Sequence, residues 1–431
     1  MNYAETLEYL IEQLPMFHRI GQAAYKNNLD NTLKLDEIFG HPHRNYNTVH
    51  VAGTNGKGSV SHMLAAVFQA AGYKTGLYTS PHLKDFRERI KINGQMISEK
   101  EVIEWVEVYP VKNNLWDIKP SFFELTAAMA FDYFAKQNVD IAIIEVGLGG
   151  RLDSTNIITP KVSIITNISL DHVNLLGDTL EKIAAEKAGI IKYGIPVVIG
   201  TTQKETKKVF IDIAKEKQTS LFFADQDYVA SYSMLGMDGR QMMNIEKNGK
   251  VEYPELKLDL LGIYQLKNVP VVLKTLDIMI EKGWKISRKN IYDGLQDTAK
   301  TTGLMGRWQI VGNNPLIICD TGHNEDGIRM VVNQIKNTAY KTLHFVFGVV
   351  TDKDPYAILR ILSADAIYYF TRADIPRAMN ERELAQKAAE FGLKGKSYPS
   401  VLEAFNAAKS NAGKNDLIFV GGSTFVVAEI L

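Results

Sequence analysis

The stretch Val49-His-Val-Ala-Gly-Thr-Asn-Gly-Lys-Gly-Ser59 decides the fold of this chain. The apolar run 48–52 predicts a buried strand, and the pattern of residues 60–71 predicts a helix directly after three glycines. A strand, a glycine-rich turn and a helix N-terminus gather several backbone N–H groups around one anion. We therefore predict a nucleotide-phosphate loop. The alternative is a glycine-rich turn that carries a solvated lysine.

The side chains of this loop also fit a triphosphate. Lys57 supplies a point charge for the β and γ phosphates, and Ser59 supplies a hydroxyl for phosphate or Mg²⁺. The match to the usual phosphate-loop pattern is incomplete, because Val51 replaces its first glycine and Gly58 separates the lysine from the serine. The predicted ATP-binding residues of the loop are Thr54, Asn55, Gly56, Lys57, Gly58 and Ser59.

Length and composition limit the classes of protein. With 431 residues the chain exceeds the usual size of a single core, so we expect two domains. Its 45% hydrophobic and 23% charged residues are typical of a globular protein. Lys+Arg and Asp+Glu both number 49, so no net field attracts nucleic acid or a membrane surface. An anionic substrate must therefore be held by a local cluster.

Cysteine usage and the N-terminal residues indicate the compartment. The single Cys319 excludes an intrachain disulfide and lies in an apolar run, as a small core residue does. Residues 1–5 lack the basic-then-apolar pattern of a signal peptide, and no apolar run reaches membrane-spanning length. We expect a cytoplasmic protein.

Short apolar runs then alternate with helical patterns, which predicts an α/β fold whose mostly parallel sheet is covered on both faces. The further strands predicted are Thr75–Tyr78, Ile141–Glu145, Val162–Thr166, Pro196–Ile199 and Ser220–Phe223. The helices predicted are Glu124–Gln137, Leu180–Lys192, Lys204–Gln218, Gln265–Lys282 and Arg288–Leu295. Turn signals within residues 228–253 predict a β-meander.

A second alternation follows the polar segment 296–303, which reads as a linker. Its predicted strands are Pro315–Cys319, His344–Gly348, Ala366–Phe370 and Asp416–Val420, and its predicted helices are Gly327–Lys336, Pro355–Leu362, Glu381–Phe391 and Val401–Ala412. No Gly-x-Gly-x-x-Gly opens this part, which argues against a dinucleotide. The predicted architecture is a phosphate-loop α/β domain, 1–297, followed by a smaller Rossmann-like α/β domain, 304–431.

Polar residues follow two strand ends that should line the ligand crevice of the first sheet. Glu145 ends one strand, and a carboxylate beside a phosphate loop is a natural Mg²⁺ ligand. His172, next to Asp171, follows another strand end and fits a metal or phosphate role. The alternatives are a glutamate that caps the following glycine turn and a structural histidine.

Lys187 lies within the apolar face of a predicted helix. Asp178 and Glu181 predict a capping box at the start of that helix. At about 100° per residue, apolar side chains surround the direction of Lys187. Burial would lower its pKa, and the neutral amine could react with CO₂ to give an anionic carbamate that binds a second metal ion. The alternative is a lysine whose amine reaches past the helix edge into solvent.

In the second alternation, Cys319-Asp-Thr-Gly-His-Asn324 ends a strand and precedes a helix. We therefore expect Asp320, His323 and Asn324 at the mouth of a cleft. Arg307, just after the linker, is placed to reach a phosphate. The alternatives are turn chemistry for the first three residues and surface charge for Arg307.

Ten further segments complete a pattern that recurs in one family. They are Thr79-Ser-Pro-His-Leu83, Glu88-Arg-Ile90, Asn93-Gly94, Ser121-Phe-Phe-Glu124, Glu145-Val-Gly-Leu-Gly-Gly-Arg-Leu-Asp153, Asp171-His172, Glu186-Lys-Ala-Gly-Ile-Ile-Lys192, Gln265-Leu-Lys-Asn268, Gly306-Arg307 and Asp352-Lys-Asp354. Together with the phosphate loop, they make nearly the whole chain resemble the folylpolyglutamate synthase and dihydrofolate synthase branch of the Mur ligase family. Ser-Pro-His-Leu and Gly-Leu-Gly-Gly-Arg-Leu-Asp distinguish this folate branch from the cell-wall ligases.

The resemblance implies an ATP-dependent ligase that joins L-glutamate to a folate-type carboxylate, dihydropteroate or tetrahydrofolate polyglutamate, through an acyl phosphate. The implied ligands of two Mg²⁺ ions are Ser80, Glu145, His172 and a carbamoylated Lys187. Further implied ATP contacts are Asn268, Arg307 and Asp320, and the implied catalytic residues are Lys57, Lys187, His172 and His323. The implied substrate-binding residues are His82, Ser121, Phe122, Phe123, Glu124 and Leu152 for the pteroate, and His323 and Ser423 for glutamate.

Three stretches depart from the family pattern. Gly322 and Glu325 flank the His-Asn pair where the family usually has Ala and Pro, and Tyr264 replaces a common histidine before Gln265. Residues 16–32 do not match the family's N-terminal pterin loop. The choice between dihydropteroate and folate, the glutamate chain length and the oligomeric state therefore stay open, and we expect a monomer.

Two competing functions remain. Another Mur-type amino-acid ligase, acting on a non-folate acid, would need an N-terminal UDP-binding domain, and the roughly fifty residues before the phosphate loop are too few for one. A nucleotide-binding regulatory module would use the same loop. This second hypothesis does not explain why Glu145, His172 and Lys187 should converge near the loop.

Overall fold

The computed structural model describes residues 1–14, 28–108, 118–351 and 354–431. The unmatched residues 16–27 and the first two residues of the segment 352–354 lie outside this part of the chain. The described residues form two compact units. One holds the chain up to Leu304 except Leu260–Ile263, and the other holds Leu260–Ile263 and Met305–Leu431. The predicted domain limits, 1–297 and 304–431, stay a prediction.

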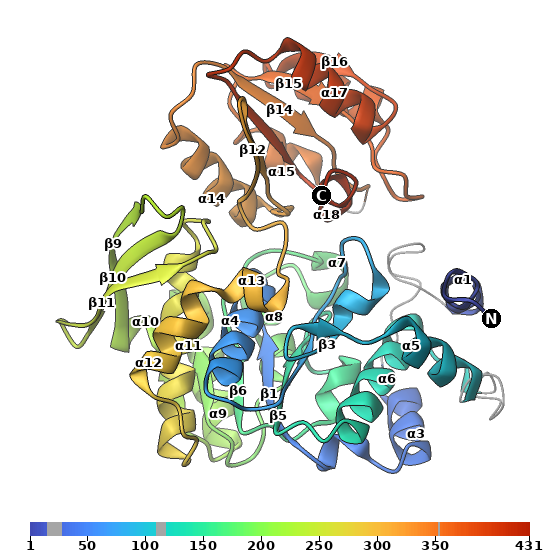
Figure 1. Ribbon diagram of the computed structural model, residues 1–431, viewed down its shortest axis with the longest axis vertical. Coiled ribbons are helices and arrows are strands. Elements are labelled where there is room, and N and C mark those ends of the chain that lie inside the picture. The colour runs from blue at the N-terminus through green and yellow to red at the C-terminus, as the bar shows by residue number, and fades with distance from the viewer. Residues whose placement is uncertain (15–27, 109–117, 352–353) are drawn as a thin grey trace. The chain divides into compact units, whose positions relative to one another are not determined.

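An eight-stranded sheet in the order β4-β3-β2-β5-β1-β6-β7-β8 forms the centre of the first unit (Figure 1). Its strands are β1 (Asn47–Ala52), β2 (Thr75–Tyr78), β3 (Ile90–Ile92), β4 (Gln95–Met96), β5 (Ile141–Glu145), β6 (Val162–Ile165), β7 (Val197–Ile199) and β8 (Leu221–Phe223). All are parallel except β3 and β4, which extend one edge as an antiparallel hairpin. The predicted mostly parallel sheet is confirmed, whereas β3 and β4 were not predicted.

Helices cover both faces of this sheet, as predicted. One face packs against α4 (Lys57–Ala70) and α11 (Gln265–Glu281). The other packs against α6 (Phe122–Lys136), α8 (Leu180–Ala188) and α9 (Lys204–Glu216) through two clusters of buried aliphatic and aromatic side chains. The remaining helices of this unit are α1 (Tyr3–Gln13), α3 (Asp30–Ile38), α5 (Glu99–Val106), α7 (Val173–Leu176), α10 (Ala224–Asp227), α12 (Arg288–Gln296), α13 (Thr298–Thr302) and the 3₁₀ helices η2 (Pro42–Arg44), η3 (Phe86–Arg89) and η6 (Ser154–Ile157).

Helix α8 differs from its prediction at both ends. Its N-cap is Thr179, whose hydroxyl accepts a 3.3 Å hydrogen bond from the Lys182 N–H, so the capping box predicted from Asp178 is wrong. Asp178 instead forms an exposed ion pair with Lys182. The helix ends at Ala188 rather than at Lys192, because the chain turns at Gly189, where a Cβ would meet the Arg151 backbone at 2.3 Å.

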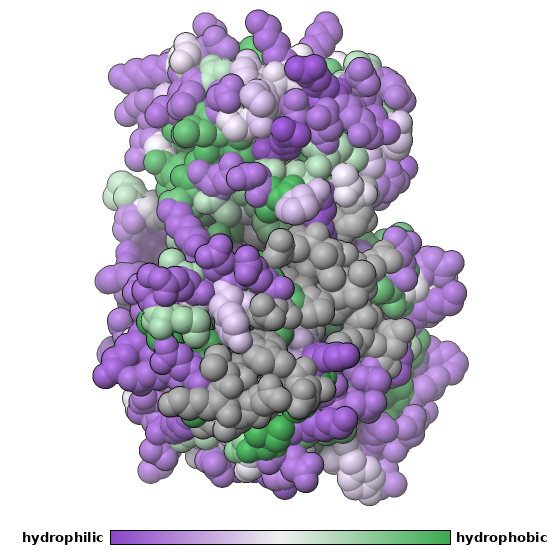
Figure 2. Space-filling model, turned by 90° about the vertical axis from the view of Figure 1, so that its right-hand side faces the viewer, coloured by the Kyte–Doolittle hydropathy of each residue, from purple (hydrophilic) through white to green (hydrophobic). Residues whose placement is uncertain are grey.

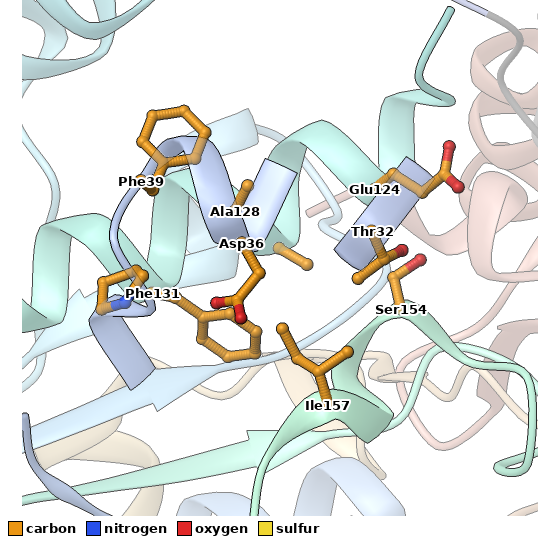
Figure 3. A pocket seen from close by; sticks show the side chains of 10 residues that line it. Thr32, Asp36, Phe39, Glu124, Ala128, Phe131, Ser154 and Ile157 are labelled. Atoms are coloured by element: carbon orange, nitrogen blue, oxygen red, sulfur yellow. The ribbon is translucent and has the colours of Figure 1, made fainter. Parts of the chain in front are cut away.

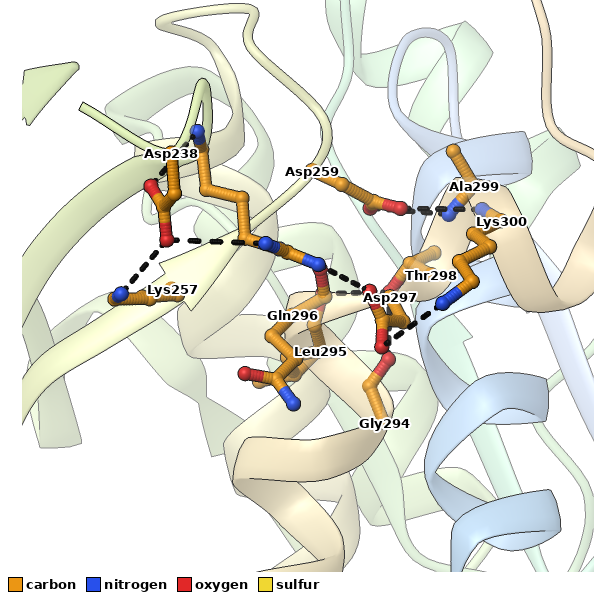
Figure 4. A network of polar contacts seen from close by, with 11 residues as sticks. Asp238, Lys257, Asp259, Gly294, Leu295, Gln296, Asp297, Thr298, Ala299 and Lys300 are labelled. Carbon is orange, nitrogen blue, oxygen red and sulfur yellow. Dashed lines mark hydrogen bonds and ion pairs between the residues drawn. The ribbon is translucent and has the colours of Figure 1, made fainter. Parts of the chain in front are cut away.

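The predicted meander forms a separate three-stranded antiparallel sheet of β9 (Tyr228–Leu235), β10 (Gln241–Lys247) and β11 (Lys250–Leu258). Arg240, at the turn between β9 and β10, donates to the Gln296 carbonyl at 2.9 Å and to Asp297 at 2.6 Å (Figure 4). In the same network, Asp259 accepts hydrogen bonds from the N–H groups of Ala299 and Lys300. The turn and the chain after β11 therefore both bind the start of α13.

The segment 296–303, predicted as a linker, is thus largely the helix α13 within the first unit. The polar composition of this segment predicted exposure, but Thr298 and Thr302 are fully buried. The Thr302 hydroxyl lies 2.7 Å from His62 Nδ1 on α4, and the Thr302 carbonyl accepts a 2.8 Å hydrogen bond from Lys91. These contacts come from residues more than 200 positions away, which a local pattern does not reveal.

The second unit is a six-stranded sheet in the order β12-β13-β17-β14-β15-β16. Its strands are β12 (Gln309–Asn313), β13 (Leu316–Cys319), β14 (Leu343–Phe347), β15 (Ile367–Phe370), β16 (Lys394–Ser397) and β17 (Leu417–Gly421), all parallel except β12. Its helices are α14 (Glu325–Lys336), α15 (Pro355–Leu359), α16 (Glu381–Ala389), α17 (Val401–Asn411) and α18 (Thr424–Ala428). The predicted Rossmann-like pattern is confirmed, and the edge strands β12 and β16 are additional.

The visible surface of the protein is mostly hydrophilic. In Figure 2, hydrophilic side chains cover most of the visible face outside the grey atoms, and hydrophobic ones gather in a few places. Among the described residues, no helix combines the length and the apolar character that a bilayer crossing requires.

Candidate functional site

The predicted phosphate loop connects β1 to α4 and depends on two glycines with positive φ. Gly53 has φ +143°, and a Cβ there would lie 1.9 Å from Thr166 Oγ1. Gly56 has φ +88°, and a Cβ there would lie 2.4 Å from Asn268 Oδ1. Neither site can accept a larger residue without displacing a neighbour. The loop backbone is therefore held between the end of β6 and the start of α11.

The end of β6 fixes the loop through Asn167, which the sequence prediction did not single out. Its carbonyl oxygen accepts the Thr54 N–H at 2.9 Å, and its side-chain oxygen accepts the Asn55 N–H at 2.9 Å. Thr54 Oγ1 in turn accepts the Ser169 N–H at 3.0 Å. Asn167 lies in the same strand-end segment that suggested His172, so the signal was present in the sequence.

Lys57 and Ser59 begin α4. Lys57 Nζ donates to the carbonyl oxygens of Gly53 and Thr54 at 3.0 and 3.1 Å, which holds the ammonium over the loop. The buried Ser59 hydroxyl accepts a 3.1 Å hydrogen bond from Gln265. Gln265 also accepts from the Asn268 amide at 2.7 Å. The two α11 residues thus lie against the loop, where the motif Gln265-Leu-Lys-Asn268 was expected.

Glu145 ends β5 in register with Val51 of β1, two residues before the loop begins. Its side chain is 4% exposed, and Oε2 accepts the backbone N–H of Ser80 at 3.2 Å. Two predicted metal ligands are therefore neighbours at the carboxyl edge of the sheet. The contact involves the Ser80 backbone, whereas the prediction concerned its hydroxyl.

Lys187 lies on α8 and is 4% exposed. Its Nζ donates a 3.0 Å hydrogen bond to the Gly53 carbonyl, so the alternative of a lysine reaching solvent is excluded. Burial and, to a smaller extent, the positive charge of Lys57 lower the pKa of Lys187 to about 7, against the opposing effect of Asp171 and Asp153. The predicted burial and low pKa are confirmed.

His172 precedes α7 with a left-handed backbone, φ +49°. Its backbone N–H donates to Asp171 Oδ1 at 2.8 Å, and its Nε2 lies 3.8 Å from the same carboxylate oxygen. The imidazole is partly exposed. The described contacts orient His172 through Asp171, and its metal role stays a prediction.

The segment predicted for the pteroate opens α6. Ser121 is the N-cap, and it exchanges hydrogen bonds with Glu124 in a capping box of 2.6 and 3.2 Å. The Phe122 ring contacts the guanidinium of Arg89, 5.4 Å from its centroid, and Phe123 packs against Tyr78. Ser121 and Glu124 therefore shape the helix start, and the phenylalanines carry the apolar surface.

Arg89 links this segment to His82. Its Nε donates to His82 Nδ1 at 2.7 Å, and the arginine is 3% exposed. Burial lowers the pKa of Arg89, with Tyr78 and Glu145 opposing the shift. A buried guanidinium near the Glu145 carboxylate was missed, although the motif Glu88-Arg-Ile90 contains it. Leu152, half-buried, precedes Asp153, whose carboxylate accepts the Leu148 N–H at 2.9 Å.

In the second unit, the predicted residues lie just before β12 and just after β13 and β17. The carboxylate of Asp320 accepts the backbone N–H groups of Trp308 and Gly322, both at 2.8 Å, which supports its turn role. Arg307 donates to the Thr321 hydroxyl, and His323 Nδ1 lies 3.0 Å from the Thr321 carbonyl. Arg307, Asp320 and His323 are thus brought together within this unit.

Two caps complete this region. Asn324 caps α14 by accepting the Gly327 N–H at 2.9 Å, as its turn alternative predicted. Ser423, 4% exposed, caps α18 through the Phe425 N–H at 3.2 Å. Cys319 is free and buried, and burial raises the pKa of its thiol to about 12, in agreement with a core residue.

Comparisons with known proteins find relatives along the whole chain. The Mur ligase middle domain matches residues 51–276, and the Mur ligase glutamate ligase domain matches residues 306–424. A folylpolyglutamate synthase of Lacticaseibacillus casei is 31% identical over all of this chain and 98% of its own length. A dihydrofolate synthase/folylpolyglutamate synthase of Bacillus subtilis is 33% identical over 94% of both chains.

The fold is shared with solved relatives. A bifunctional folylpolyglutamate synthase/dihydrofolate synthase of Yersinia pestis, crystallised with AMPPNP and a Mn ion, superposes with a TM-score of 0.83 at 29% identity. The match covers 100% of this chain and 97% of that one. Sequence and structure agree over the full length. The chain therefore belongs to the folylpolyglutamate synthase/dihydrofolate synthase branch of the Mur ligase family.

Proposed function

We propose that the phosphate loop, Glu145 and Lys187 form the centre of an ATP-dependent ligase that joins L-glutamate to a folate-type carboxylate. The ligase class and the folate substrates follow from the family. The observation that carries the assignment to these residues is the Lys187–Gly53 hydrogen bond, which brings a buried amine to the loop while Glu145 lies in register with Val51. A regulatory nucleotide-binding module gives no reason for this convergence.

The reaction needs an activated acid, because a carboxylate is a poor acylating agent. In the proposed sequence, a carboxylate oxygen attacks the γ-phosphorus of ATP, ADP leaves, and an acyl phosphate forms. The amine of L-glutamate then attacks the acyl carbon, the C–O bond breaks, and inorganic phosphate and a proton leave. The Lys57 ammonium, already held over the loop by two carbonyls, neutralises charge on the transferring phosphate.

The proposed metal donors fit Mg²⁺ only in part. Glu145 and the Ser80 hydroxyl offer the oxygen ligands that a hard cation prefers, whereas the Lys187 amine and the His172 imidazole do not. When bound, Mg²⁺ would neutralise phosphate charge and orient the γ-phosphate. Of the chain's own residues, Glu145 would hold the ion with one oxygen while its Oε2 stays oriented by the Ser80 N–H.

A carbamate on Lys187 would resolve the mismatch at that residue. The neutral amine attacks CO₂, a C–N bond forms, and one proton is released, which leaves an anionic group with two oxygens. Burial and the pKa of about 7 favour the neutral amine at physiological pH. A carbamate keeps one N–H on Nζ, so the hydrogen bond to Gly53 is compatible with the modification.

The remaining roles are also proposals. Asn268, at the start of α11, is assigned to adenine, and Arg307 and Asp320 are assigned to ATP contacts. His172 is assigned to metal binding, and His323 and Ser423 to L-glutamate. Phe122, Phe123, His82 and Leu152 are assigned to the pteroate, with Ser121 and Glu124 shaping that segment. The cytoplasmic location and the monomeric state stay predictions.

The test is ATP turnover with separated substrates. We expect phosphate release only when ATP, a pterin acid and L-glutamate are all present, with dihydropteroate and tetrahydrofolate compared as acceptors. Equal release without the acid would refute the ligase assignment of this site. Omitting L-glutamate alone should stop amide formation, which mass spectrometry of the product detects as the absence of one added glutamyl unit.

A further inference from the structure

A second cluster of metal-binding side chains lies away from the phosphate loop, where α3 meets η2. Asp36 comes from the last turn of α3, and His41 and His43 flank Pro42 at the start of η2. His41 Nδ1 lies 2.6 Å from Asp36 Oδ2, and His43 Nε2 lies 3.3 Å from the Asp36 carboxylate. One ligand atom from each of the three residues lies within 4.8 Å of the others.

The Asp36 carboxylate is only partly satisfied by these contacts. The residue is 6% exposed, and its buried Oδ1 takes part in no hydrogen bond in the described part of the chain, although His43 Nε2 lies 3.3 Å from it. Figure 3 shows this carboxylate on the Phe131 side of a small, mostly apolar pocket that Asp36 lines. Glu124, which also lines the pocket, is turned away from it in the same view. A buried carboxylate oxygen without a donor is costly, unless a cation compensates it.

We infer that Asp36, His41 and His43 form a site for a divalent transition metal, with Zn²⁺ as the ion that fits best. Two imidazole nitrogens and one carboxylate oxygen are ligands that zinc accepts, whereas Mg²⁺ and Ca²⁺ prefer oxygen alone. Three protein ligands leave a fourth position for water. The His41 side chain is 38% exposed, so the cluster reaches solvent on that side.

The position of the cluster gives the metal a structural role. All three ligands come from the short segment 36–43, so the ion would fasten η2 to the end of α3. Both elements pack against α6, and the His43 ring contacts Phe131 of that helix edge-on at 6.0 Å. The start of α6 carries the segment 121–124 assigned to the pteroate. By fixing α3 and η2, the ion would stabilise the elements that pack against this helix. The metal site itself does not depend on that assignment.

The experiment measures metal content of the full-length protein. After treatment with EDTA and desalting, the protein is dialysed against Zn²⁺ in the presence of excess Mg²⁺, which occupies any site of hard oxygen ligands. We expect one tightly bound Zn²⁺ per chain by elemental analysis. Co²⁺ in its place should give visible d–d absorption bands that Zn²⁺ removes.

Variants locate the ion. His41→Gln and His43→Gln should weaken Zn²⁺ binding by roughly tenfold or more and abolish the Co²⁺ bands. His41 is half-exposed, so its variant keeps the test informative even where His43→Gln fails to fold. The matched control is His344→Gln, because His344 Nε2 also lies 3.3 Å from a carboxylate, that of Asp416, and no third ligand joins this pair among the described residues. It should bind Zn²⁺ like the parent.

Three results would overturn the site. They are the absence of stoichiometric Zn²⁺, displacement of Zn²⁺ by the excess Mg²⁺, and unchanged Zn²⁺ affinity of His41→Gln. Any of them would leave Asp36 as the acceptor of two histidine hydrogen bonds and nothing more.

Discussion

Lys187 Nζ donates a 3.0 Å hydrogen bond to the carbonyl oxygen of Gly53, although 134 residues separate them. Gly53 is the first residue of the phosphate loop. The Lys187 amine of α8 therefore lies next to the position proposed for the triphosphate. Within the described part of the chain, Lys187 forms no ion pair with a carboxylate, so an ammonium at this depth would lose its hydration without compensation. We therefore expect the Lys187 amine to be either neutral or covalently modified, and each state can be measured.

The titration of Lys187 should appear in the stability of the protein. Its pKa is about 7 when folded and 10.5 when unfolded, so the unfolded chain binds more protons between these values. The free energy of unfolding should thus rise with pH across this window, by up to about 1.4 kcal/mol per unit. Below the window this group should cause no pH dependence, because the folded and unfolded states both hold its proton. Urea denaturation in CO₂-free buffer at both ends of the window measures the slope. Lys187→Met should lack this contribution, and equal slopes would mean an ordinary lysine.

Lys57→Ala should abolish ATP-dependent turnover and leave the fold intact. The ammonium donates to two loop carbonyls, and its loss removes a charge at the transferring phosphate. We expect a rate at least about a hundredfold lower, with unchanged circular dichroism. The control is Lys208→Ala, which removes an exposed lysine that pairs with Asp212 on α9. Near-normal turnover of Lys57→Ala would refute the assignment of the loop.

Gly56→Ala should weaken nucleotide binding more than it weakens the fold. A Cβ at this φ of +88° would displace the Asn268 amide, 2.4 Å away, which is assigned to adenine. Gly249→Ala is the matched control, because its φ is +75° and nothing lies within 4 Å. Both variants should lose about 1–2 kcal/mol of unfolding free energy from the left-handed backbone. Only Gly56→Ala should lose ADP affinity in calorimetry, and equal affinities would separate Asn268 from the nucleotide.

The sequence pattern correctly predicted the features of the fold that depend on residues close together in the chain. β1, the loop and α4 are continuous in sequence, and the burial of Lys187 followed from the period of its own helix. The N-cap of the same helix could not be predicted in this way. Thr179 and Asp178 are both good N-cap residues, and tertiary position decides between them. β16 is exposed along its whole length and has no alternation to recognise.

Long-range contacts account for the rest. Gln265 meets the Ser59 hydroxyl across 206 residues, and Thr302 meets His62 across 240. Such pairs depend on how helices pack, which a single sequence does not encode locally. Polar α13 was read as a linker for this reason, and Arg89 was not singled out although it is buried near Glu145.

Glu145→Gln should change the Mg²⁺ requirement specifically. The amide can still accept the Ser80 N–H, so the local structure should persist, but the charge that a hard cation requires is lost. We expect activity that partly returns at high Mg²⁺, measured as the Mg²⁺ concentration for half-maximal turnover. Glu216→Gln, which removes a carboxylate at the exposed end of α9, is the control. An unchanged Mg²⁺ response would return Glu145 to a structural role at the strand end.

Lys187→Ala should lose activity that acetate or formate partly restores. A carbamate places an anionic group of two oxygens in the space beside Gly53, and a small carboxylate can fill the same space once the side chain is removed. Lys187→Arg should not be rescued, because a permanent cation would occupy the position of an anion. In the parent enzyme, carbon-13-labelled bicarbonate should give a carbamate resonance that both variants lack. If the parent shows no such resonance and formate restores nothing to Lys187→Ala, the buried amine acts unmodified, through its hydrogen bond to the loop alone.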